Sequence, residues 1–232
     1  MARAEASIGP HAVTDGNPRP GRIRRQNEAR ILAAAETVFA EKGFEGATTA
    51  EIAAAAGLPK ANVHYYFATK EAIYRAVLDR ILTLWLAAFD PAAAGDDPAA
   101  VLAAYIAAKM RHSREHPAAS RVFAMEIMRG APVIRGFLEG ELRAWVQRQA
   151  GLMQRWAAEG RMDPVDPVHL LFLIWAATQT YADFDTQICA VRGQARQRGG
   201  DFERATATLT RIVLKGCGVA PRALADGRSA VR

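Results

Sequence analysis

Four polar or aromatic side chains lie close together in residues 59–66, PKANVHYY. Asparagine can make a bidentate contact with adenine, and lysine can contact guanine, so these side chains are suited to base edges. Histidine and tyrosine tips can add contacts to bases or to the sugar–phosphate backbone. The sequence therefore predicts a DNA-contact surface made by Lys60, Asn62, His64 and Tyr65.

A second set of groups is suited to phosphate. Thr49 and Lys70 each lie at an expected helix start, where backbone N–H groups and the helix dipole favour an anion. Residues 19–30, RPGRIRRQNEAR, hold five arginines and one glutamate in a chain of net charge +6. A solvated, flexible N-terminus would also explain this cluster, but beside a DNA-contact surface we favour an arm that follows the DNA backbone. Its expected contacts come from Arg22, Arg24 and Arg25.

A possible ligand site is indicated further along the chain. Trp175 and Gln179 are four residues apart in an expected helix and therefore face the same side. The glutamine amide both donates and accepts hydrogen bonds, and inside an apolar helix it needs partners. A small polar ligand or neighbouring protein groups would serve equally well. Lys109 is interpreted as a long side chain whose charge reaches water.

The sequence lacks the patterns of an enzyme or a metal protein. The five histidines are scattered, and no phosphate loop, nucleophile elbow or zinc spacing occurs. Cys189 and Cys217 fit reduced thiols better than a disulfide framework. No apolar run is long enough to cross a bilayer and no secretory signal is evident. We expect no catalytic residues, no metal, no cofactor, no membrane contact and a cytoplasmic location.

The side chains suited to DNA need a short helical frame. Thr48 followed by Glu51 is a capping-box pair, which predicts a helix beginning at Thr49. Gly57 can end this helix in a left-handed conformation, and Pro59 can open the next one. Two short helices joined by a glycine turn predict a helix-turn-helix with residues 59–66 as the recognition helix.

The remaining chain shows helical spacing interrupted by proline and glycine. Helices are expected from about Asn27 to Gly43, from Thr69 towards Asp90-Pro91, from Asp166-Pro167 across the LLFLIWAATQTYADF run, and over 201–216. No segment alternates as a strand does, so the chain is expected to be all-α. The predicted divisions are a disordered arm (1–20), a DNA-binding domain (21–70), a ligand-binding and dimerisation bundle (71–218) and a flexible tail (219–232).

The stretch TTAEIAAAAGLPKANVHYYFATKEAIY resembles the DNA-binding signature of the TetR family of one-component repressors. The resemblance implies a three-helix DNA-binding head, an all-α ligand-binding and dimerisation body, and a homodimer on operator DNA. It also implies a phosphate contact by Lys70 and aromatic phosphate contacts from the recognition helix. In two positions the sequence departs from the family pattern: His64 stands where the family usually has tyrosine, and Pro59 where it has a capping serine.

The body carries a narrower resemblance. IWAATQTYADF, HPAASRVFAMEIMRGAP, VDPVHL and LTLWLAAF are similar to uracil-responsive TetR-family repressors of pyrimidine utilisation. This implies a planar pyrimidine against tryptophan, hydrogen-bonded by glutamine. The matching positions are Trp85, Trp175 and Gln179, with Tyr105 and Tyr181 as further wall residues. The homodimer is expected to form through the helix containing Leu170–Ala177 and the last helix. A different effector, or constitutive DNA binding, remains the alternative.

Overall fold

The computed structural model describes residues 20–93 and 95–219. The predicted disordered arm (1–20) and flexible tail (219–232) lie outside the described residues, except for Pro20 and Val219. The described chain consists of helices and connecting loops, which confirms the all-α expectation. Among these residues, no helix combines the length and apolar character needed to span a membrane.

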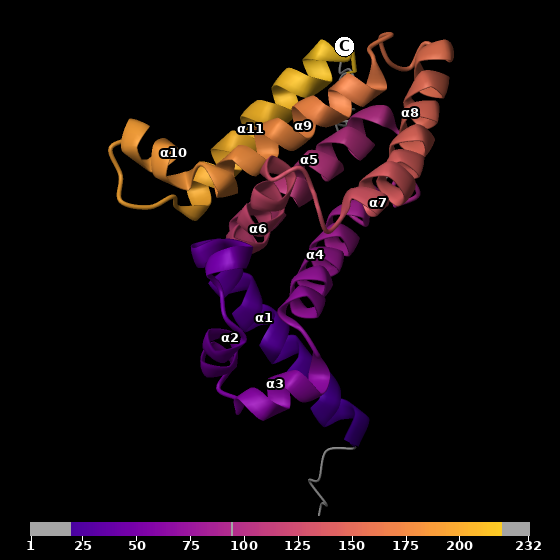
Figure 1. The fold of residues 1–232 in the computed structure, drawn as a ribbon. Helices are drawn as coiled ribbons and strands as arrows, with labels where there is room; N and C mark the ends of the chain where they lie inside the picture. The colour runs from indigo at the N-terminus through magenta and orange to yellow at the C-terminus, as the bar shows by residue number, and fades with distance from the viewer. Residues whose placement is uncertain (1–19, 94, 220–232) are drawn as a thin grey trace, which may run out of the picture.

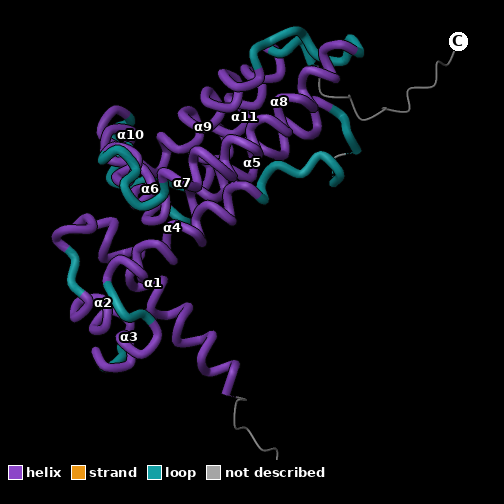
Figure 2. Tube along the Cα trace, turned by 45° about the vertical axis from the view of Figure 1, so that its right-hand side comes forward, coloured by secondary structure: helices purple, strands orange, loops and turns teal. Residues whose placement is uncertain are grey.

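The molecule has a small helical head at one end and a larger helical body at the other (Figure 1). Helix α4 runs from the head into the body, and α5, α9 and α11 lie together in the body in both views (Figures 1 and 2). The elements are α1 (Pro20–Gly46), α2 (Thr49–Ala56), α3 (Lys60–Tyr66), α4 (Lys70–Leu86), α5 (Pro98–Glu115), α6 (Pro117–Met128), α7 (Arg135–Phe137), the π-helical turn η1 (Leu138–Leu142), α8 (Arg143–Ala158), α9 (Pro167–Asp183), α10 (Asp185–Val191) and α11 (Gly199–Gly216).

The helix-turn-helix forms by the local chemistry that its sequence predicts. The Thr48 hydroxyl accepts a hydrogen bond from the Glu51 backbone N–H (3.2 Å), and the Glu51 carboxylate accepts one from the Thr48 N–H (3.0 Å). This capping box starts α2. Gly57 ends it with φ 61° and ψ 37°, a left-handed conformation that favours glycine. Pro59 then precedes α3, and the predicted recognition helix is confirmed as Lys60–Tyr66.

The first helix begins earlier than the sequence predicted. It starts at Pro20 rather than near Asn27, so the three expected arm arginines lie on its first turns. Proline suits a first helical position, and an i,i+4 ion pair between Arg24 and Glu28 (3.0 Å) adds local support. Residues 21–26 are therefore helical, which argues against the alternative of a flexible N-terminus for this stretch, and the contact of its arginines with DNA stays a prediction. At the other end Gly43 has φ 68°, so the chain kinks before α1 ends at Gly46.

The apolar core is divided into two clusters. The body cluster joins α5, α8, α9 and α11. The head cluster joins α1–α3 with α4 and also takes residues from α6 and the loop after it, ending at Ile134. Helix α4 therefore buries most of its length in the head and reaches the body with its last turn. The division predicted at residue 70 stays a prediction, but the core of the head continues past it.

A buried carboxylate fixes the junction between α4 and α6. Glu126 is fully buried and accepts a hydrogen bond from the Tyr74 hydroxyl (3.2 Å). Its other oxygen accepts from the backbone N–H groups of Val133 (2.6 Å) and Ile134 (3.3 Å). Burial raises the pKa of Tyr74, the main cause, and the neighbouring Glu126 adds to the effect. Because buried polar groups need partners, these contacts hold α4 in one position against the body.

Candidate DNA-contact surface and effector cavity

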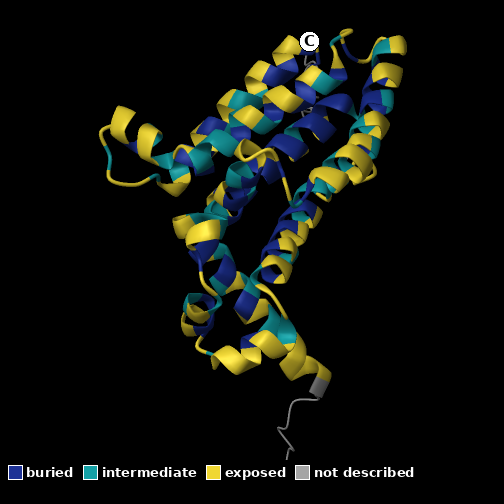
Figure 3. Ribbon diagram, in the orientation of Figure 1, coloured by how far each residue is buried: buried dark blue, intermediate teal, exposed yellow. Residues whose placement is uncertain are grey.

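Helix α3 presents its polar side chains to solvent from an apolar base. Its own Val63 is fully buried on the inner side, while Lys60, Asn62 and His64 are exposed and Tyr65 is 75% exposed. In Figure 3 this helix forms an exposed edge of the head, away from the body. The structure therefore places the four side chains predicted to contact DNA on one exposed helix.

Helix α3 is also held against the first helix of the head. Asn27 donates a hydrogen bond from Nδ2 to the Tyr66 hydroxyl (3.1 Å). The Tyr66 ring meets Tyr65 edge-on at 5.2 Å between centroids. The exposed arginines Arg22, Arg24 and Arg25 lie two to five residues before Asn27 on α1. The head thus combines an anchored recognition helix with a basic helical extension beside it.

The two residues predicted to contact phosphate from helix starts, Thr49 and Lys70, differ in their surroundings. Thr49 lies at the first position of α2 and is partly exposed. The Lys70 ammonium donates hydrogen bonds to the carbonyl oxygens of Phe44 (2.7 Å) and Ala47 (3.0 Å), with Glu45 O at 3.4 Å. It also lies 4.5 Å from the centre of the Phe44 ring. Lys70 therefore closes the end of α1, and its phosphate contact stays a prediction.

A cavity of about 40 Å³ lies in the body, beside the last turn of α4. Its walls come from α4, α5, α6, η1, α8 and α9. The lining residues are Leu82, Trp85, Leu86, Tyr105, Lys109, Phe123, Leu142, Trp145, Trp175 and Gln179. The structure thus brings together four of the five side chains predicted to bind a ligand: Trp85, Tyr105, Trp175 and Gln179.

The polar groups of the cavity are arranged around its aromatic walls. Trp175 donates a hydrogen bond from Nε1 to the Tyr105 hydroxyl oxygen at 2.6 Å, and its ring lies 6.3 Å from that of Trp145. Burial raises the pKa of Tyr105, so this residue stays protonated as a neutral donor. Gln179 adds an amide that donates and accepts. The site therefore offers flat apolar faces with a few directed polar groups, as small-molecule sites commonly do.

Two expectations about this cavity are wrong. Tyr181 does not line it, since its ring lies against Phe202 at 6.0 Å. A residue two positions after Gln179 is turned by about 200° around the helix, so it faces the other side. Lys109 does not reach the protein surface: it is 3% exposed, and its ammonium lies 4.0 Å from the centre of the Trp85 ring. Burial lowers the pKa of Lys109 to about 7.

Sequence reasoning also missed Phe123 and Trp145 as cavity residues. Trp85 meets the Phe123 ring edge-on at 4.8 Å, across the junction between α4 and α6. Lys109 follows Tyr105 by four positions on α5, and this spacing places both on one side of the helix. The four-residue spacing from Tyr105 could therefore have identified Lys109 as a cavity residue. Phe123 and Trp145 have no predicted cavity residue three or four positions away on the same helix, so spacing could not identify them.

The cavity must widen to hold a planar ring. One water needs roughly 10–15 Å³ measured in this way, so the cavity has room for about three waters. A pyrimidine has more non-hydrogen atoms than that. Trp85 and Phe123 form the part of its wall that lies at the junction of α4 and α6.

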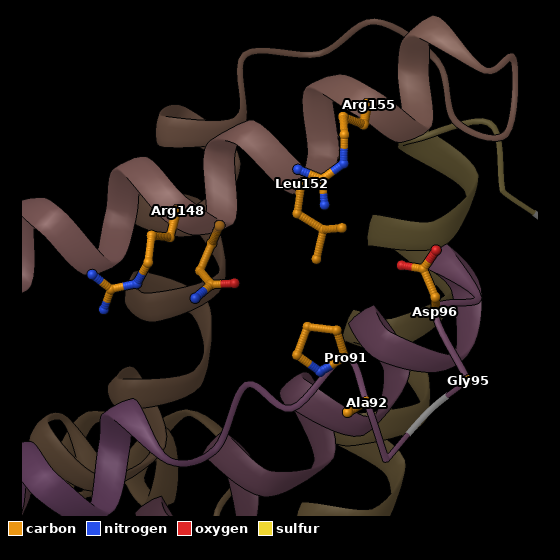
Figure 4. A pocket seen from close by; sticks show the side chains of 8 residues that line it. Pro91, Ala92, Gly95, Asp96, Arg148, Leu152 and Arg155 are labelled. Carbon is orange, nitrogen blue, oxygen red and sulfur yellow. The ribbon is translucent and has the colours of Figure 1, made fainter.

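A wider hollow of about 600 Å³ lies between α8 and the loop that joins α4 to α5 (Figure 4). Arg148, Leu152 and Arg155 reach it from α8, while Pro91 and Asp96 lie on the opposite side. It has no aromatic wall, and its charged groups are at the surface. Within the described part of the chain, no group of three or more His, Cys, Asp or Glu side chains could hold a metal.

Comparison with known proteins identifies the family. Residues 31–77 match the family described as bacterial regulatory proteins, tetR family, and residues 78–220 match the YcdC-like protein C-terminal region. The second match alone covers more than half of the chain. The chain therefore belongs to the TetR family, and it is a ligand-responsive, DNA-binding transcriptional regulator.

Individual relatives agree with this assignment. The HTH-type transcriptional regulator RutR of Escherichia coli strain K12 is 41% identical over 186 residues, covering 80% of this chain and 88% of that protein. The regulator EthR of Mycolicibacterium smegmatis is 27% identical over 81% of this chain and 84% of its own length.

Solved structures have the same fold. A transcriptional regulator of Streptomyces coelicolor has a TM-score of 0.62 at 28% identity, covering 84% of this chain and 99% of its own. The TetR-family regulator PfmR of Thermus thermophilus has a TM-score of 0.63 at 22% identity, covering 84% and 97%.

Proposed function

We propose that this regulator is a homodimeric, cytoplasmic repressor that leaves its operator when uracil or a closely related pyrimidine binds in the body. The observation that carries the proposal is the cavity in which Trp85 and Trp175 lie with the Gln179 amide. Aromatic faces suit a flat ring, and an amide suits its alternating C=O and N–H groups. The resemblance of the body to pyrimidine-responsive members of the family supports the choice of ligand.

The dimer is proposed to form through α9 and α11. Phe172 and Leu173 on α9 are 49% and 55% exposed, and Ile212 on α11 is 57% exposed. Large apolar side chains gathered at the surface commonly mark a protein–protein interface. Two copies joined there would present two recognition helices to a near-palindromic duplex with half-sites about 10 bp, or a multiple, apart. Light scattering on wild type and Leu173→Arg tests this interface, since the charge should produce monomers.

Helix α4 is the proposed lever between ligand and DNA. It begins at Lys70 beside the recognition helix, packs in the head over most of its length and ends in the cavity wall at Trp85. The distance along the helix is about 22 Å. A ligand that parts Trp85 from Phe123 would shift this end of α4 and with it the heads. To release DNA, the ligand must bind the DNA-incompetent arrangement more tightly than the competent one.

The test measures ligand and operator binding on the same protein. Calorimetry with uracil, thymine, a purine and an amino acid, with and without operator, should show pyrimidine binding that weakens operator affinity. A coupling of about 1–3 kcal/mol corresponds to some 5–150-fold, and operator should weaken ligand binding by the same factor. Gln179→Ala should lose the response while keeping DNA binding. Gln187→Ala, on the exposed side of α10, is the control.

Two results would refute parts of the proposal. If none of the ligands tested binds, the proposed effector is wrong. If uracil binds tightly but operator affinity does not change, the switch is wrong.

A further inference from the structure

The Lys109 ammonium faces the cavity with no oxygen partner from the protein. Across residues 20–93 and 95–219 it makes no hydrogen bond and no ion pair within 4.0 Å, yet its side chain is only 3% exposed. The Trp85 ring lies against the ammonium at 4.0 Å and stabilises the cation from one side only. An ammonium has three donors and no acceptor, and none of the three is used in a hydrogen bond to the described residues, so they can be donated to an oxygen of a ligand.

The charged surroundings of Lys109 are few. Asp183 on α9 attracts it, but the Asp183 carboxylate already accepts a hydrogen bond from Ser120 at 2.6 Å. On its own helix, Arg111 and His112 lie nearby, and burial, the main cause, lowers the pKa of His112 to about 4, so this histidine is neutral at pH 7. The cavity walls contributed by α4, α6, η1 and α8 are all uncharged: Leu82, Trp85, Leu86, Phe123, Leu142 and Trp145.

A second donor lies one helical turn away. The Tyr105 hydroxyl accepts its hydrogen bond from Trp175, which leaves its own O–H proton free to be donated. Lys109 and Tyr105 are four residues apart on α5 and both line the cavity. This wall therefore carries two donors side by side and calls for two acceptors on the ligand.

We propose that Lys109 binds a ring oxygen of the effector, so that the site selects planar rings with two carbonyl acceptors and takes up a proton as the ring enters. The proposal rests on the proposed function. It adds a contact between Lys109 and a ring oxygen, a preference for rings with two carbonyl groups, and the uptake of a proton on binding. Uracil and thymine carry two ring carbonyl oxygens. Cytosine replaces one of them with an amino group, which would set a donor against Lys109 or Tyr105.

The expected proton uptake follows from the buried position of the Lys109 amine. In the ligand-free protein burial lowers the pKa of Lys109 to about 7, so the amine is only partly charged at neutral pH. A carbonyl oxygen against the ammonium favours the charged form and raises this pKa in the complex. The complex then holds more protons than the free protein above pH 7. Uracil affinity should accordingly be constant below pH 7 and fall as pH rises above it, by up to about tenfold per pH unit.

The experiment is uracil calorimetry on the full-length protein between pH 6 and 9. Each titration is repeated in two buffers of different ionisation enthalpy, which counts the protons taken up. Wild type should take up a fraction of a proton at pH 7 and more at pH 8. Lys109→Met should bind uracil roughly 10- to 100-fold more weakly at pH 6, the range expected for a hydrogen bond to a charged group. Its affinity should not change with pH, and its proton uptake should be zero.

Four further measurements make the result specific. Lys109→Gln keeps a neutral donor, so it should bind better than Lys109→Met and still show no proton uptake. Lys215→Met changes an exposed lysine on α11 and should behave as wild type. Cytosine should bind wild type at least tenfold more weakly than uracil, a difference of the size expected for opposed donors. Thermal melts check folding, and removing an unpaired buried charge should not lower stability.

The outcomes separate this proposal from the function on which it rests. Equal uracil affinity and equal proton uptake in wild type and Lys109→Met would overturn the Lys109 contact and leave uracil binding in place. Equal affinity for cytosine and uracil would overturn the selection rule. If wild type binds no pyrimidine, both proposals fail. If Lys109→Met does not fold, wild-type proton counting decides: uptake that rises above pH 7 supports the contact, and zero uptake overturns it.

Discussion

The head and the body place their functional side chains in opposite environments. On α3, Asn62 and its polar neighbours point into solvent, while Val63 of the same helix is buried and packs in the core of the head. In the body, Trp145 and Tyr105 form the wall of a cavity and are themselves part of the packed interior. If these side chains contact DNA as predicted, binding and folding in the head depend on different atoms. In the body the same atoms serve both, because a wall residue is also a core residue.

This difference predicts how substitutions behave. A change at an exposed tip should alter affinity and leave stability within about 0.5 kcal/mol. A change in the cavity wall should alter both, since truncating a buried ring leaves a void as well as a missing contact. Four experiments, from the largest expected effect to the smallest, would break or sharpen this contrast.

Trp145→Ala should be the most damaging of these changes. The ring is buried and lies 5.9 Å from Phe89 and 6.3 Å from Trp175. Its loss should lower the free energy of unfolding by about 3–5 kcal/mol and abolish ligand binding. Urea unfolding at fixed protein concentration measures the loss. Val191→Ala, at a position 82% exposed, is the control and should unfold as wild type. A loss of unfolding free energy below about 1 kcal/mol in Trp145→Ala would contradict the expected difference between head and body.

Asn62→Ala should weaken operator binding without affecting the fold. The side chain is exposed, and a lost bidentate base contact costs about 1–3 kcal/mol. Operator titrations should show this loss, while affinity for a scrambled duplex and the unfolding midpoint stay the same. An unfolding midpoint that falls together with operator affinity would contradict the separation of binding and folding in the head.

Lys70→Met tests a residue that should contribute both to DNA binding and to stability. If Lys70 also contacts phosphate, its removal should weaken binding to all sequences alike and flatten the salt dependence. Its ammonium closes α1 through the carbonyl groups of Phe44 and Ala47, so we also expect a stability loss of about 1–2 kcal/mol. Weaker binding at unchanged stability would show that the carbonyl contacts contribute little. Lost stability at unchanged binding would remove the phosphate contact.

Truncation to a chain beginning at Asn27 should have the smallest effect at physiological salt. It removes Arg22, Arg24 and Arg25 together with the first turns of α1, whose side chains are exposed. Stability should change by less than about 0.5 kcal/mol, because an exposed pair such as Arg24–Glu28 contributes little. DNA affinity should fall mainly at low salt, where phosphate contacts are strongest. Identical binding isotherms would leave these arginines without a role in DNA binding.

Sequence reasoning succeeded where structure is decided by near neighbours. The capping box at Thr48, the glycine at 57 and the bounds of α3 each depend on residues within one or two turns. It failed where a distant element decides. Lys109 looked like a surface lysine because only the folded chain shows that Trp85 covers it. Trp145 and Phe123 join the cavity through contacts between helices that no spacing along the chain records.

The shared core at the junction limits how this protein can be recombined. Ala119, Val122, Ala131 and Ile134 lie beyond residue 70 in the sequence yet complete the apolar interior around α1 and α4. A hybrid regulator that joins this DNA-reading module to a foreign sensor at residue 70 would lose nearly all of α4, those four contributors and the Glu126 contact to Tyr74. The natural unit of exchange is therefore discontinuous along the chain: residues 20–86 with the α6 segment through Ile134. Engineers who seek new sensors for this operator would do better to redesign the cavity in place.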